Sequence, residues 1–440
     1  MKIAMSSYTG MGAWWVLRLM AEGHDVDYYL SKPEYEDVLR GLIPPPKRLS
    51  LDHRRHQAGY GYPSYKGYDL SLFDVTGKPK QAEHSRSQCP TLGDGGFEEM
   101  LEDDRKFGLE VMEGCGINVP PYTEFQTASE GKAFVKKEGG RYVYKPYETP
   151  DATDKSITYV AKDAEDMLGM IDNLWKASKN APFILQEFVS GVELGVEAFF
   201  NGEDFYLISG TMEEKKFMND NKGPNTGCSG NLIFAMRGDE RIYKEGLLKA
   251  KSFLQAAGFK GIIDLNTIIT KDKIYGLEWT PRFGYLCCPT IAVMYGAGYG
   301  ELLSDIASGK TPHLGWDHAF GAGTTITIPP YPTEIRIPKA KGIPIDGIDP
   351  EDIEQLRETY LYDAMRAPGG KGGLITSGNL GYIGAVLAGG ASIEAAFAKV
   401  DQRLKGIQIP NCQYRTDLEK TAKKKYDTLD VQGWFSGDEI

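Results

Sequence analysis

The sequence predicts a multidomain protein that combines α/β and α+β regions. A chain of 440 residues exceeds what one ordinary hydrophobic core supports, so about two to four domains are expected. Near the N-terminus, strand patterns alternate with a glycine turn and a helical pattern, which is the order that builds a parallel sheet. Past residue 320, short strand patterns and one long helical pattern indicate a smaller α+β unit.

Composition argues against several classes of partner. Lysine and arginine number 50 against 61 acidic residues, and the net charge of −11 disfavours binding to nucleic acid or to an anionic membrane. No apolar run approaches the roughly 20 residues of a membrane span, and the first residues lack the layout of a signal peptide. The six cysteines form no CxxC pair, which is typical of reduced thiols in a cytoplasmic protein.

The N-terminal elements follow from apolar periodicity. Residues 1–7 predict a buried strand, residues 13–23 a helix and residues 24–30 a second strand. Gly10 and Gly12 lie in the turn between the first strand and the helix. Two interpretations of this turn are open: the glycines allow a tight connection, or the backbone N–H groups at the helix start bind a phosphate.

The rest of the chain continues the mixture of strands and helices. Residues 68–74 predict a further strand of the first sheet, and residues 78–95 have the composition of a linker. Helical patterns cover residues 97–116, 164–177 and 245–258, and strand patterns cover residues 141–147, 183–189, 195–200, 205–210, 261–270 and 273–279. Residues 324–330, 373–390 and the helical pattern 392–406 are assigned to a separate, smaller unit.

Polar side chains on two neighbouring strand patterns indicate a metal site. Asp264 and Asn266 are two residues apart, so they face the same side of their strand, and Glu278 on the next strand can join them. Oxygen ligands from adjacent strands suit Mg²⁺, which takes water and phosphate oxygens as its other ligands. Arg282 would hold the charge of a transferring phosphoryl group; the alternative is a surface ion pair.

A glycine-rich stretch, NKGPNTGCSGN, covers residues 221–231. A chain places so much glycine where its backbone turns sharply or approaches a ligand closely. The two interpretations are therefore a surface turn and a backbone cradle for a small anionic substrate. The sequence has no GxxxxGK[ST] phosphate loop that could supply such a cradle elsewhere.

The order of these segments resembles the glycinamide ribonucleotide synthetase (phosphoribosylamine–glycine ligase) family of ATP-grasp ligases, over most of the chain. The segments that carry the resemblance are LEDDRKFGLEVMEGCGINVP, LQEFVSGVELGVEAFFNG, KKFMNDNKGPNTGCSGN, FKGIIDLNTIITKDKIYGLEWTPRFG, GGLITSGNLGYIGAVLAGGASIEAAFAKVD and QYRTDLEKTA. GPNTG is the specific motif among them, and the full series in order strengthens the resemblance.

The resemblance implies a fold and a reaction. The expected fold is ATP-grasp, with an N-terminal Rossmann-like (pre-ATP-grasp) domain at 1–95, an ATP-grasp domain at 96–315 with a lid subdomain at about 122–188, and a small C-terminal α+β domain at 316–440. The expected reaction joins phosphoribosylamine and glycine through an acyl phosphate, with release of ADP and phosphate, in purine biosynthesis. The implied cofactors are ATP and Mg²⁺ (or Mn²⁺). The expected partners are small molecules, and the expected protein is a cytoplasmic monomer or homodimer.

The resemblance also assigns roles to residues of this sequence. ATP binding is expected from Arg105, Lys145, Lys155, Gln186, Glu187, Phe188, Val189 and Glu193, and catalysis from Lys215 and Arg282. Substrate contact is expected from Gly10, Gly12, Gly223, Pro224, Asn225, Thr226 and Gly227. Metal binding is expected from Glu278 together with Asp264, Asn266 and Thr280.

Four departures from the family pattern keep alternatives open. The family's N-terminal GGGGREHA is SSYTGMGAWW, and its lid loop GLAAGKGV is ETPDATDKSIT, which has no glycine. Thr280 replaces an asparagine, so we expect Asp264 or Asn266 to compensate. The family's RFGDPE is replaced by RFGYLCCP in this chain, and the family's GGRVL is replaced by GNLGYI. We expect Cys287 and Cys288 of the first segment to be buried as small apolar residues. The alternatives are a family member that joins a different amino acid or amine, and a non-catalytic nucleotide-binding homologue.

Overall fold

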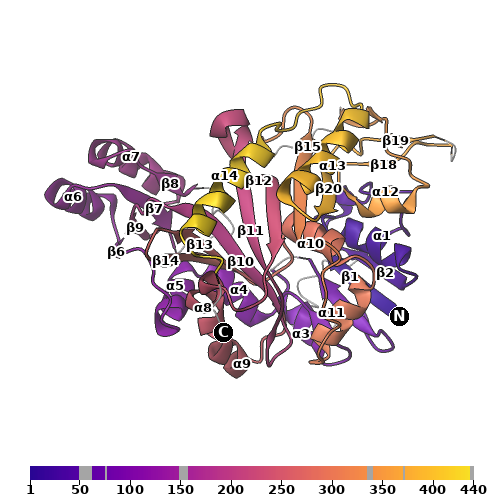
Figure 1. Cartoon of the computed structure of the whole chain (residues 1–440), viewed down its shortest axis with the longest axis horizontal. Helices are drawn as coiled ribbons and strands as arrows, with labels where there is room; N and C mark the ends of the chain where they lie inside the picture. The colour runs from indigo at the N-terminus through magenta and orange to yellow at the C-terminus, as the bar shows by residue number, and fades with distance from the viewer. Residues whose placement is uncertain (49–61, 75–76, 148–156, 334–339, 370–371, 437–440) are drawn as a thin grey trace.

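The computed structural model describes residues 1–48, 62–74, 77–147, 157–333, 340–369 and 372–436. Three regions follow one another across the molecule in Figure 1: a small sheet with α6 and α7 at one end, a long central sheet, and an N-terminal layer at the other end. No helix among the described residues is both long and apolar enough to cross a membrane.

The N-terminal layer is a parallel sheet. Its strands are β1 (Lys2–Ser7), β2 (Asp25–Leu30), β3 (Lys47–Arg48), β4 (Leu70–Phe73) and β5 (Thr91–Leu92), in the order β3-β2-β1-β4-β5. Every pairing among them is parallel, as predicted, and α1 (Ala13–Ala21) packs on β2. The strand order reverses direction between β1 and β4, and ligands of such sheets bind beside the carboxyl ends of the strands at that point.

The prediction of a linker at residues 78–95 is wrong. These residues form α3 (Pro79–Arg86) and the edge strand β5, which completes the parallel sheet. Pro79 occupies the first helical turn, where a missing N–H costs nothing, and Gln81, Ala82 and Ser85 face the interior. The helix was not predicted because its buried side chains are small or hydrogen-bonding, so the sequence shows no apolar pattern there.

The small sheet has the order β6-β9-β7-β8 and is covered by two helices. Its elements are β6 (Tyr122–Phe125), α6 (Ala128–Glu138), β7 (Tyr142–Pro146), β8 (Tyr159–Val160), α7 (Ala164–Ala177) and β9 (Phe183–Glu187). It has a hydrophobic core of its own, in which Tyr144 stacks on Phe183 with ring centroids 4.6 Å apart. The predicted helix at 164–177 is confirmed as α7.

The central sheet has eight strands in the order β14-β13-β10-β11-β12-β15-β20-β17. They are β10 (Val192–Phe200), β11 (Phe205–Met218), β12 (Lys222–Ala235), β13 (Gly261–Ile269), β14 (Ile274–Thr280), β15 (Phe320–Thr327), β17 (Thr359–Leu361) and β20 (Tyr382–Gly390). Because β12 pairs directly with β15, the C-terminal strands extend this sheet. The prediction that the smaller α+β unit past residue 320 is separate is therefore wrong for its strands, while the domain bounds 316–440 stay a prediction.

The remaining described elements surround these sheets. They are η1 (Pro33–Tyr35), α4 (Gly96–Asp103), α5 (Arg105–Gly114), η3 (Asn219–Asn221), α8 (Arg241–Glu245), η4 (Leu247–Ala250), α9 (Lys251–Ala257), α10 (Cys287–Tyr295), α11 (Tyr299–Ala307), β16 (Pro344–Ile345), α12 (Ile353–Arg357), β18 (Met365–Arg366), β19 (Leu374–Ile375), α13 (Ile393–Gly406) and α14 (Leu418–Val431).

Two predicted helices are interrupted. The pattern at 97–116 breaks between α4 and α5, because Asp104 leaves the helical conformation and its side chain caps the second helix through the N–H of Phe107. The pattern at 245–258 breaks at Gly246, although it ends at Gly258 in the left-handed conformation as predicted.

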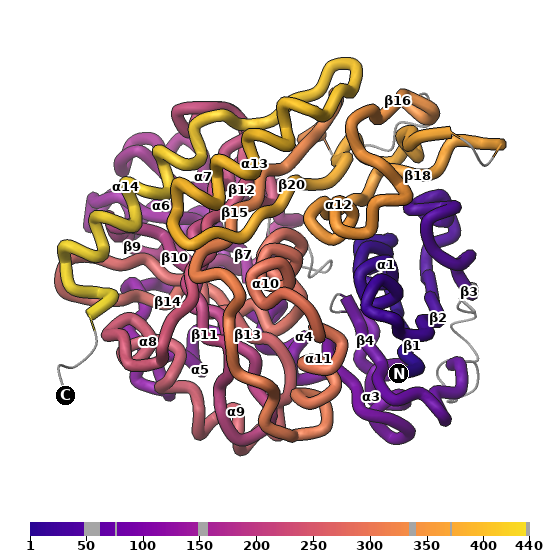
Figure 2. Tube along the Cα trace, turned by 45° about the vertical axis from the view of Figure 1, so that its right-hand side comes forward, coloured from indigo at the N-terminus to yellow at the C-terminus, as the bar shows by residue number. Residues whose placement is uncertain are grey.

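The C-terminal segment also contacts the N-terminal layer. Figure 2 shows α12 beside α1, and the indole N–H of Trp14 donates to the carbonyl oxygen of Thr359 at 2.9 Å. The N–H of Leu39 donates to the carbonyl oxygen of Ala364 at 2.8 Å. These contacts fix the carboxyl ends of the parallel strands against β17 and the residues that follow it.

Candidate functional site

The predicted hairpin of β13 and β14 places the candidate metal ligands together. Asn266 lies opposite Glu278, and Asp264 lies opposite Thr280. The amide nitrogen of Asn266 is 2.8 Å from a carboxyl oxygen of Asp264 and 3.5 Å from the hydroxyl of Thr280. The prediction that these side chains share one face of two paired strands is confirmed, while their role in metal binding stays a prediction.

Two further carboxyl groups, which sequence reasoning missed, join this face. Glu197 on β10 lies opposite Asp264, and Glu213 lies on the neighbouring strand β11. Burial and the nearby Glu213 raise the pKa of Glu197 to about 8. Burial, Glu197 and Glu213 likewise raise the pKa of Asp264 well above its usual range. We call Glu197, Glu213, Asp264 and Glu278 the acidic cluster.

Thiols from α10 donate to the acidic cluster. The Cys287 thiol lies 3.3 Å from Glu213 Oε1, and the Cys288 thiol lies 3.8 Å from Glu197 Oε1. Burial raises the pKa of both thiols well above the usual range, so they act as neutral donors. The prediction that both cysteines are buried is confirmed; their hydrogen bonds to carboxyl groups were not foreseen.

Three cations face the acidic cluster. They are Arg105 on α5, Lys145 on β7 and Lys215 on β11. Burial and the nearby Arg105 lower the pKa of Lys145 to about 8, although Glu278 and Glu193 oppose the shift. Burial lowers the pKa of Lys215, but Glu193, Glu213 and Glu278 more than offset this, so the net shift is upward. The structure therefore brings Arg105, Lys145, Glu193 and Lys215 to one place, as the sequence led us to expect.

The balance of charge in this region fits a divalent cation. Arg105, Lys145 and Lys215 share this region with the acidic cluster and Glu193. Carboxyl oxygen Oδ1 of Asp264 is buried and has no hydrogen-bond partner among the described residues. Buried carboxyl groups of this kind ionise only when a nearby cation supplies the missing charge. The donor set of carboxylate, amide and hydroxyl oxygens is that of a Mg²⁺ or Mn²⁺ site.

Arg282 follows β14 and is held by an acid from α4. Its guanidinium group makes a two-pronged contact with Glu102, with distances of 3.0 to 3.2 Å. Burial lowers the pKa of Arg282, but the carboxylate of Glu102 offsets this and raises it overall. The guanidinium carbon also lies 5.3 Å from the ring centroid of Tyr285. Arg282 is thus a fixed cation beside the strand end, and Glu102 is a partner that the sequence did not reveal.

The segment expected to contact adenine runs along the end of β9. The N–H groups of Glu187 and Phe188 already donate to the carbonyl oxygens of Pro121 and Arg141. The Arg141 guanidinium covers the Phe188 ring at 3.5 Å, and Gln186 is buried while Val189 is partly exposed. These contacts join the end of β9 to Pro121 and to Arg141, which precedes β7. The expected residue Lys155 lies outside the described residues.

The GPNTG motif is the start of a strand, not a loop. Residues 223–227 belong to β12, which pairs with β11 through two irregularities in register. Gly223 has a φ of 79°, a conformation that favours glycine, and the hydroxyl of Thr226 donates to the carbonyl oxygen of Lys215. Gly223, Pro224 and Asn225 are exposed. The motif therefore lies directly beside Lys215, and its contact with substrate stays a prediction.

The N-terminal glycine turn is closed by its own side chains. The N–H groups of Gly10 and Gly12 both donate to the Ser7 hydroxyl, at 3.0 and 3.3 Å, and that hydroxyl donates to Asp74 at 2.5 Å. A Cβ atom on Gly12 would lie 2.9 Å from Asp74 Oδ2. This geometry fits the interpretation of a tight connection. Substrate contact by Gly10 and Gly12 stays a prediction.

A group of tyrosines links the glycine turn to Arg282. The hydroxyl groups of Tyr360 and Tyr362 donate to the carbonyl oxygens of Met11 and Thr9. Burial raises the pKa of Tyr360 well above its usual range, and the nearby Tyr382, Tyr285 and Asp74 add to the shift. Tyr285, which lies against Arg282, is therefore close to the same group.

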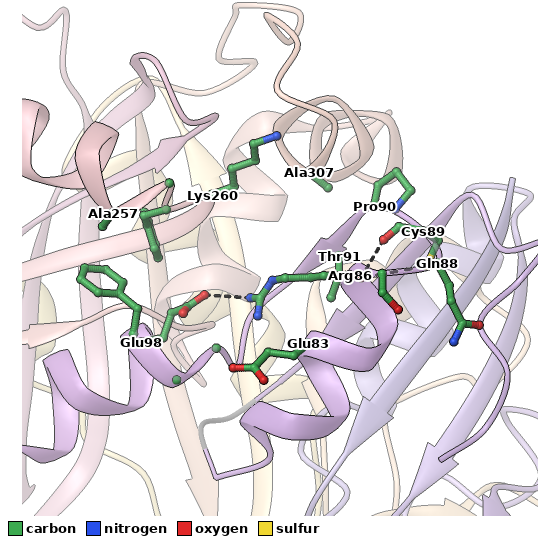
Figure 3. Close-up of a pocket in the computed structure, with 16 residues that line it drawn as sticks. Glu83, Arg86, Gln88, Cys89, Pro90, Thr91, Glu98, Ala257, Lys260 and Ala307 are labelled. Atoms are coloured by element: carbon green, nitrogen blue, oxygen red, sulfur yellow. Dashed lines mark hydrogen bonds and ion pairs between the residues drawn. The ribbon is translucent and has the colours of Figure 1, made fainter. Parts of the chain in front are cut away.

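A separate cavity of about 660 Å³ lies between α3, α4, α9 and α11. Figure 3 shows Arg86 extending to Glu98 across this cavity, with Lys260 on the opposite wall. The Arg86–Glu98 ion pair is 2.8 Å long, so the arginine charge is already balanced. None of the predicted site residues lines the cavity, and we assign it no role.

A long antiparallel sheet and a small antiparallel sheet, with lysines and carboxyl groups gathered between them, define the ATP-grasp class. Residues 103–288 match the family model described as "Phosphoribosylglycinamide synthetase, ATP-grasp (A) domain". Over those residues, the chain is similar to the ATP-grasp domain of the phosphoribosylglycinamide synthetase family.

Relatives with known names agree with this placement. The phosphoribosylamine–glycine ligase of Streptococcus pneumoniae strain R6 is 25% identical over 340 residues, covering 74% of this chain and 76% of the relative. The enzyme of the same name from Halalkalibacterium halodurans is 24% identical over 332 residues, covering 73% and 74%.

Solved structures agree in fold. The phosphoribosylamine–glycine ligase from Thermotoga maritima superposes with a TM-score of 0.72 at 18% identity, covering 95% of this chain and 100% of that one. An L-amino acid ligase from Bacillus licheniformis gives a TM-score of 0.59 at 16% identity, covering 94% and 99%. The ATP-grasp fold that the sequence predicted is confirmed.

Proposed function

We propose that the protein is an ATP-dependent carboxylate–amine ligase whose reaction joins glycine to phosphoribosylamine. The observation that carries this proposal is the meeting of Lys145, Arg105 and Lys215 with the acidic cluster, in a chain whose named relatives are phosphoribosylamine–glycine ligases. Cations that hold phosphates, beside carboxyl groups that hold a divalent ion, are what phosphoryl transfer requires.

The chemistry has two steps. A carboxylate oxygen of glycine attacks the γ-phosphorus of ATP, the bond to the bridging oxygen breaks, and ADP leaves with that electron pair. The amine nitrogen then attacks the acyl carbon and loses a proton, and phosphate leaves to give the amide. The first step is needed because a free carboxylate has no adequate leaving group, and a closed site protects the acyl phosphate from water.

We assign a separate role in this reaction to each group of site residues. Lys145 and Arg105 would hold ATP phosphates, and Lys215 lies where it can orient the glycine carboxylate near them. Arg282, fixed by Glu102, would offset charge that develops on the transferring phosphoryl group. Glu278, Asp264 and Asn266 would hold a divalent ion. When bound, that ion neutralises phosphate charge and polarises the phosphoryl group.

The proposal is tested by turnover. Purified protein with ATP, Mg²⁺, glycine and phosphoribosylamine should release ADP and phosphate, and the release should depend on both co-substrates. ADP release that ignores the amine, or no release with any amine and amino acid, would contradict the ligase proposal. The second result would favour a non-catalytic nucleotide-binding homologue.

A second candidate keeps the chemistry and changes the amine. One observation favours it: the N–H groups of Gly10 and Gly12 are taken by Ser7, so the turn does not offer them to a phosphorylated substrate. A screen of phosphorylated and unphosphorylated amines, with ADP release as the readout, separates the two candidates. A clear preference for an unphosphorylated amine would favour the second.

A further inference from the structure

Two lysine side chains converge on the ring of Tyr8. The Nζ atom of Lys32 lies 4.4 Å from the ring centroid, and the Nζ atom of Lys78 lies 5.1 Å from it. The three residues follow different parallel strands: Tyr8 follows β1, Lys32 follows β2 and Lys78 follows β4. Segments distant in the sequence therefore bring two ammonium groups to one aromatic face, at the carboxyl ends of the strands.

These ammonium groups lack carboxylate partners. Neither lysine forms a salt bridge within the described ranges of the chain. Burial lowers the pKa of Lys78, Lys32 lowers it further, and Asp94 opposes the shift. Two like charges held together in this way destabilise each other unless an anion binds between them. The arrangement contrasts with Arg86, whose charge Glu98 balances.

The acids near this cluster are Asp74 and Asp94, and both are buried. Burial raises the pKa of Asp94 to about 7, although the backbone N–H groups of Lys78 and Gly77 oppose the shift, so this carboxyl group is partly protonated at neutral pH. Burial raises the pKa of Asp74 to about 6, and its Oδ2 accepts from Ser7. Neither acid makes a salt bridge to the two lysines in the described structure, so neither acid holds an ammonium group directly.

The position in the sheet also points to a ligand. The order β3-β2-β1-β4-β5 reverses between β1 and β4, and Tyr8 and Lys78 lie on the two sides of that reversal. In open parallel sheets this is where ligands bind. The backbone N–H groups of Gly10 and Gly12 are already used, so side chains must supply the positive charge for an anionic ligand here.

We infer that Lys32 and Lys78, supported by the ring of Tyr8, bind the phosphate group of the amine substrate. The inference rests on the proposed function, because phosphoribosylamine carries a phosphate monoester. Lysine ammonium groups bind phosphate as point charges, and a face of an aromatic ring limits the freedom of both side chains. The lysines thereby supply what the closed glycine turn does not.

The test uses ribose 5-phosphate, a stable phosphate monoester, and measures binding by calorimetry. Lys32→Met and Lys78→Met keep the apolar stem and remove the charge, and each should weaken binding about tenfold to 100-fold. Lys80→Met, on the exposed side of α3, is the matched control and should bind as the wild type does. Ribose without the phosphate should bind weakly and equally to all four proteins.

A further variant, at Asp94, should change the affinity for ribose 5-phosphate in the opposite direction. Asp94→Asn removes a charge that faces Lys78 and keeps a side-chain oxygen that can accept from the backbone, so it should tighten binding of ribose 5-phosphate. In turnover, both lysine variants should raise KM for phosphoribosylamine and leave KM for ATP unchanged. Binding of ribose 5-phosphate that is equal in the wild type and both lysine variants would overturn the inference.

The two proposals fail separately, because binding needs no turnover. Lysine-dependent binding without any ADP release would refute the ligase proposal and support the phosphate site. Normal amine-dependent ADP release, with binding that ignores both lysines, would refute the phosphate site and support the ligase.

Discussion

Two regions of the molecule gather ionisable groups of one kind: carboxyl groups in the first and ammonium groups in the second. The first, which we call the strand site, consists of the acidic cluster with Arg105, Lys145 and Lys215, and four carboxyl groups lie together there. The second, which we call the turn site, consists of Tyr8, Gly10, Gly12, Lys32, Asp74 and Lys78, and its ammonium groups lack salt-bridge partners in the described structure.

The difference indicates which ligand each region needs. Buried carboxyl groups with raised pKa values are stabilised by a cation, and ammonium groups held close to each other are stabilised by an anion. The strand site therefore suits a divalent ion together with the phosphates that bind it. The turn site suits a phosphate monoester.

Removing the central carboxylate of the strand site should have the largest effect. Glu278→Ala should lower kcat about 100-fold to 1000-fold, because it removes charge that holds the ion at the reacting phosphates. Its melting temperature should stay within about 3 °C of the wild type, since the side chain is only partly buried. The exposed Glu203→Ala is the matched control; near-normal kcat in the Glu278 variant would refute the assignment.

Lys145 should make ATP binding depend on pH. Its pKa of about 8 lies below the usual lysine value, so the free protein loses this charge as pH rises through 8. ATP phosphates favour the charged form, so affinity should be constant below pH 8 and fall about tenfold per unit above it. Lys145→Met should weaken ATP binding about tenfold to 100-fold and abolish the pH dependence.

A second group titrates in the same range and needs a control. Burial raises the pKa of Glu197 to about 8, so this carboxyl group ionises as Lys145 loses its proton. Titration calorimetry with ATP in the absence of divalent ions reports on the lysine. A pH dependence above 8 that persists in Lys145→Met would assign it to another group.

Asn266 should take over the role of the asparagine that Thr280 replaces. Asn266→Ala should raise the Mg²⁺ concentration for half-maximal turnover about tenfold, because the amide lies opposite Glu278 and orients Asp264. Thr280→Ala, the matched variant on the paired strand, should change this concentration less. A larger change in Mg²⁺ requirement for Thr280→Ala than for Asn266→Ala would show that Asn266 on β13 does not replace the family's asparagine as a metal ligand.

A substitution that adds a side chain in the tightly packed glycine turn of the turn site should lower the stability of the fold. Gly12→Ala should destabilise the fold by about 1 to 3 kcal/mol in urea unfolding, because the new Cβ would lie 2.5 Å from Met5 Cε and 2.9 Å from Asp74 Oδ2. Gly169→Ala on α7, where nothing lies within 4 Å, should stabilise it by about 0.5 to 1 kcal/mol. Equal stability of both variants would contradict the close packing of the turn.

Much of the strand site could be predicted from the sequence, but little of the turn site could be. Asp264, Asn266 and Glu278 could be placed together because a period of two and a short hairpin fix which side chains share a face. Glu197 and Glu213 were missed because an acid within an apolar strand pattern looks the same whether it is buried or exposed. Their burial depends on β10 and β11 lying inside the central sheet, which periodicity cannot show.

The turn site depends on tertiary contacts throughout. Lys32 and Lys78 are 46 positions apart by number (78 − 32), and only the parallel arrangement of β2, β1 and β4 brings them to Tyr8. The break of the predicted helix at Asp104 is a similar case, because the cap competes with helical propensity that is continuous in the sequence. Family resemblance indicated the fold; physical contacts indicated which residues this chain uses.

Isotope transfer tests the central claim most directly. Glycine labelled with ¹⁸O in its carboxylate, turned over with ATP, Mg²⁺ and phosphoribosylamine, should pass one labelled oxygen to each phosphate released, because the acyl phosphate breaks at the acyl carbon. Phosphate without the label, formed at the rate of ADP release, would show that ATP is hydrolysed by water and would contradict the ligase mechanism.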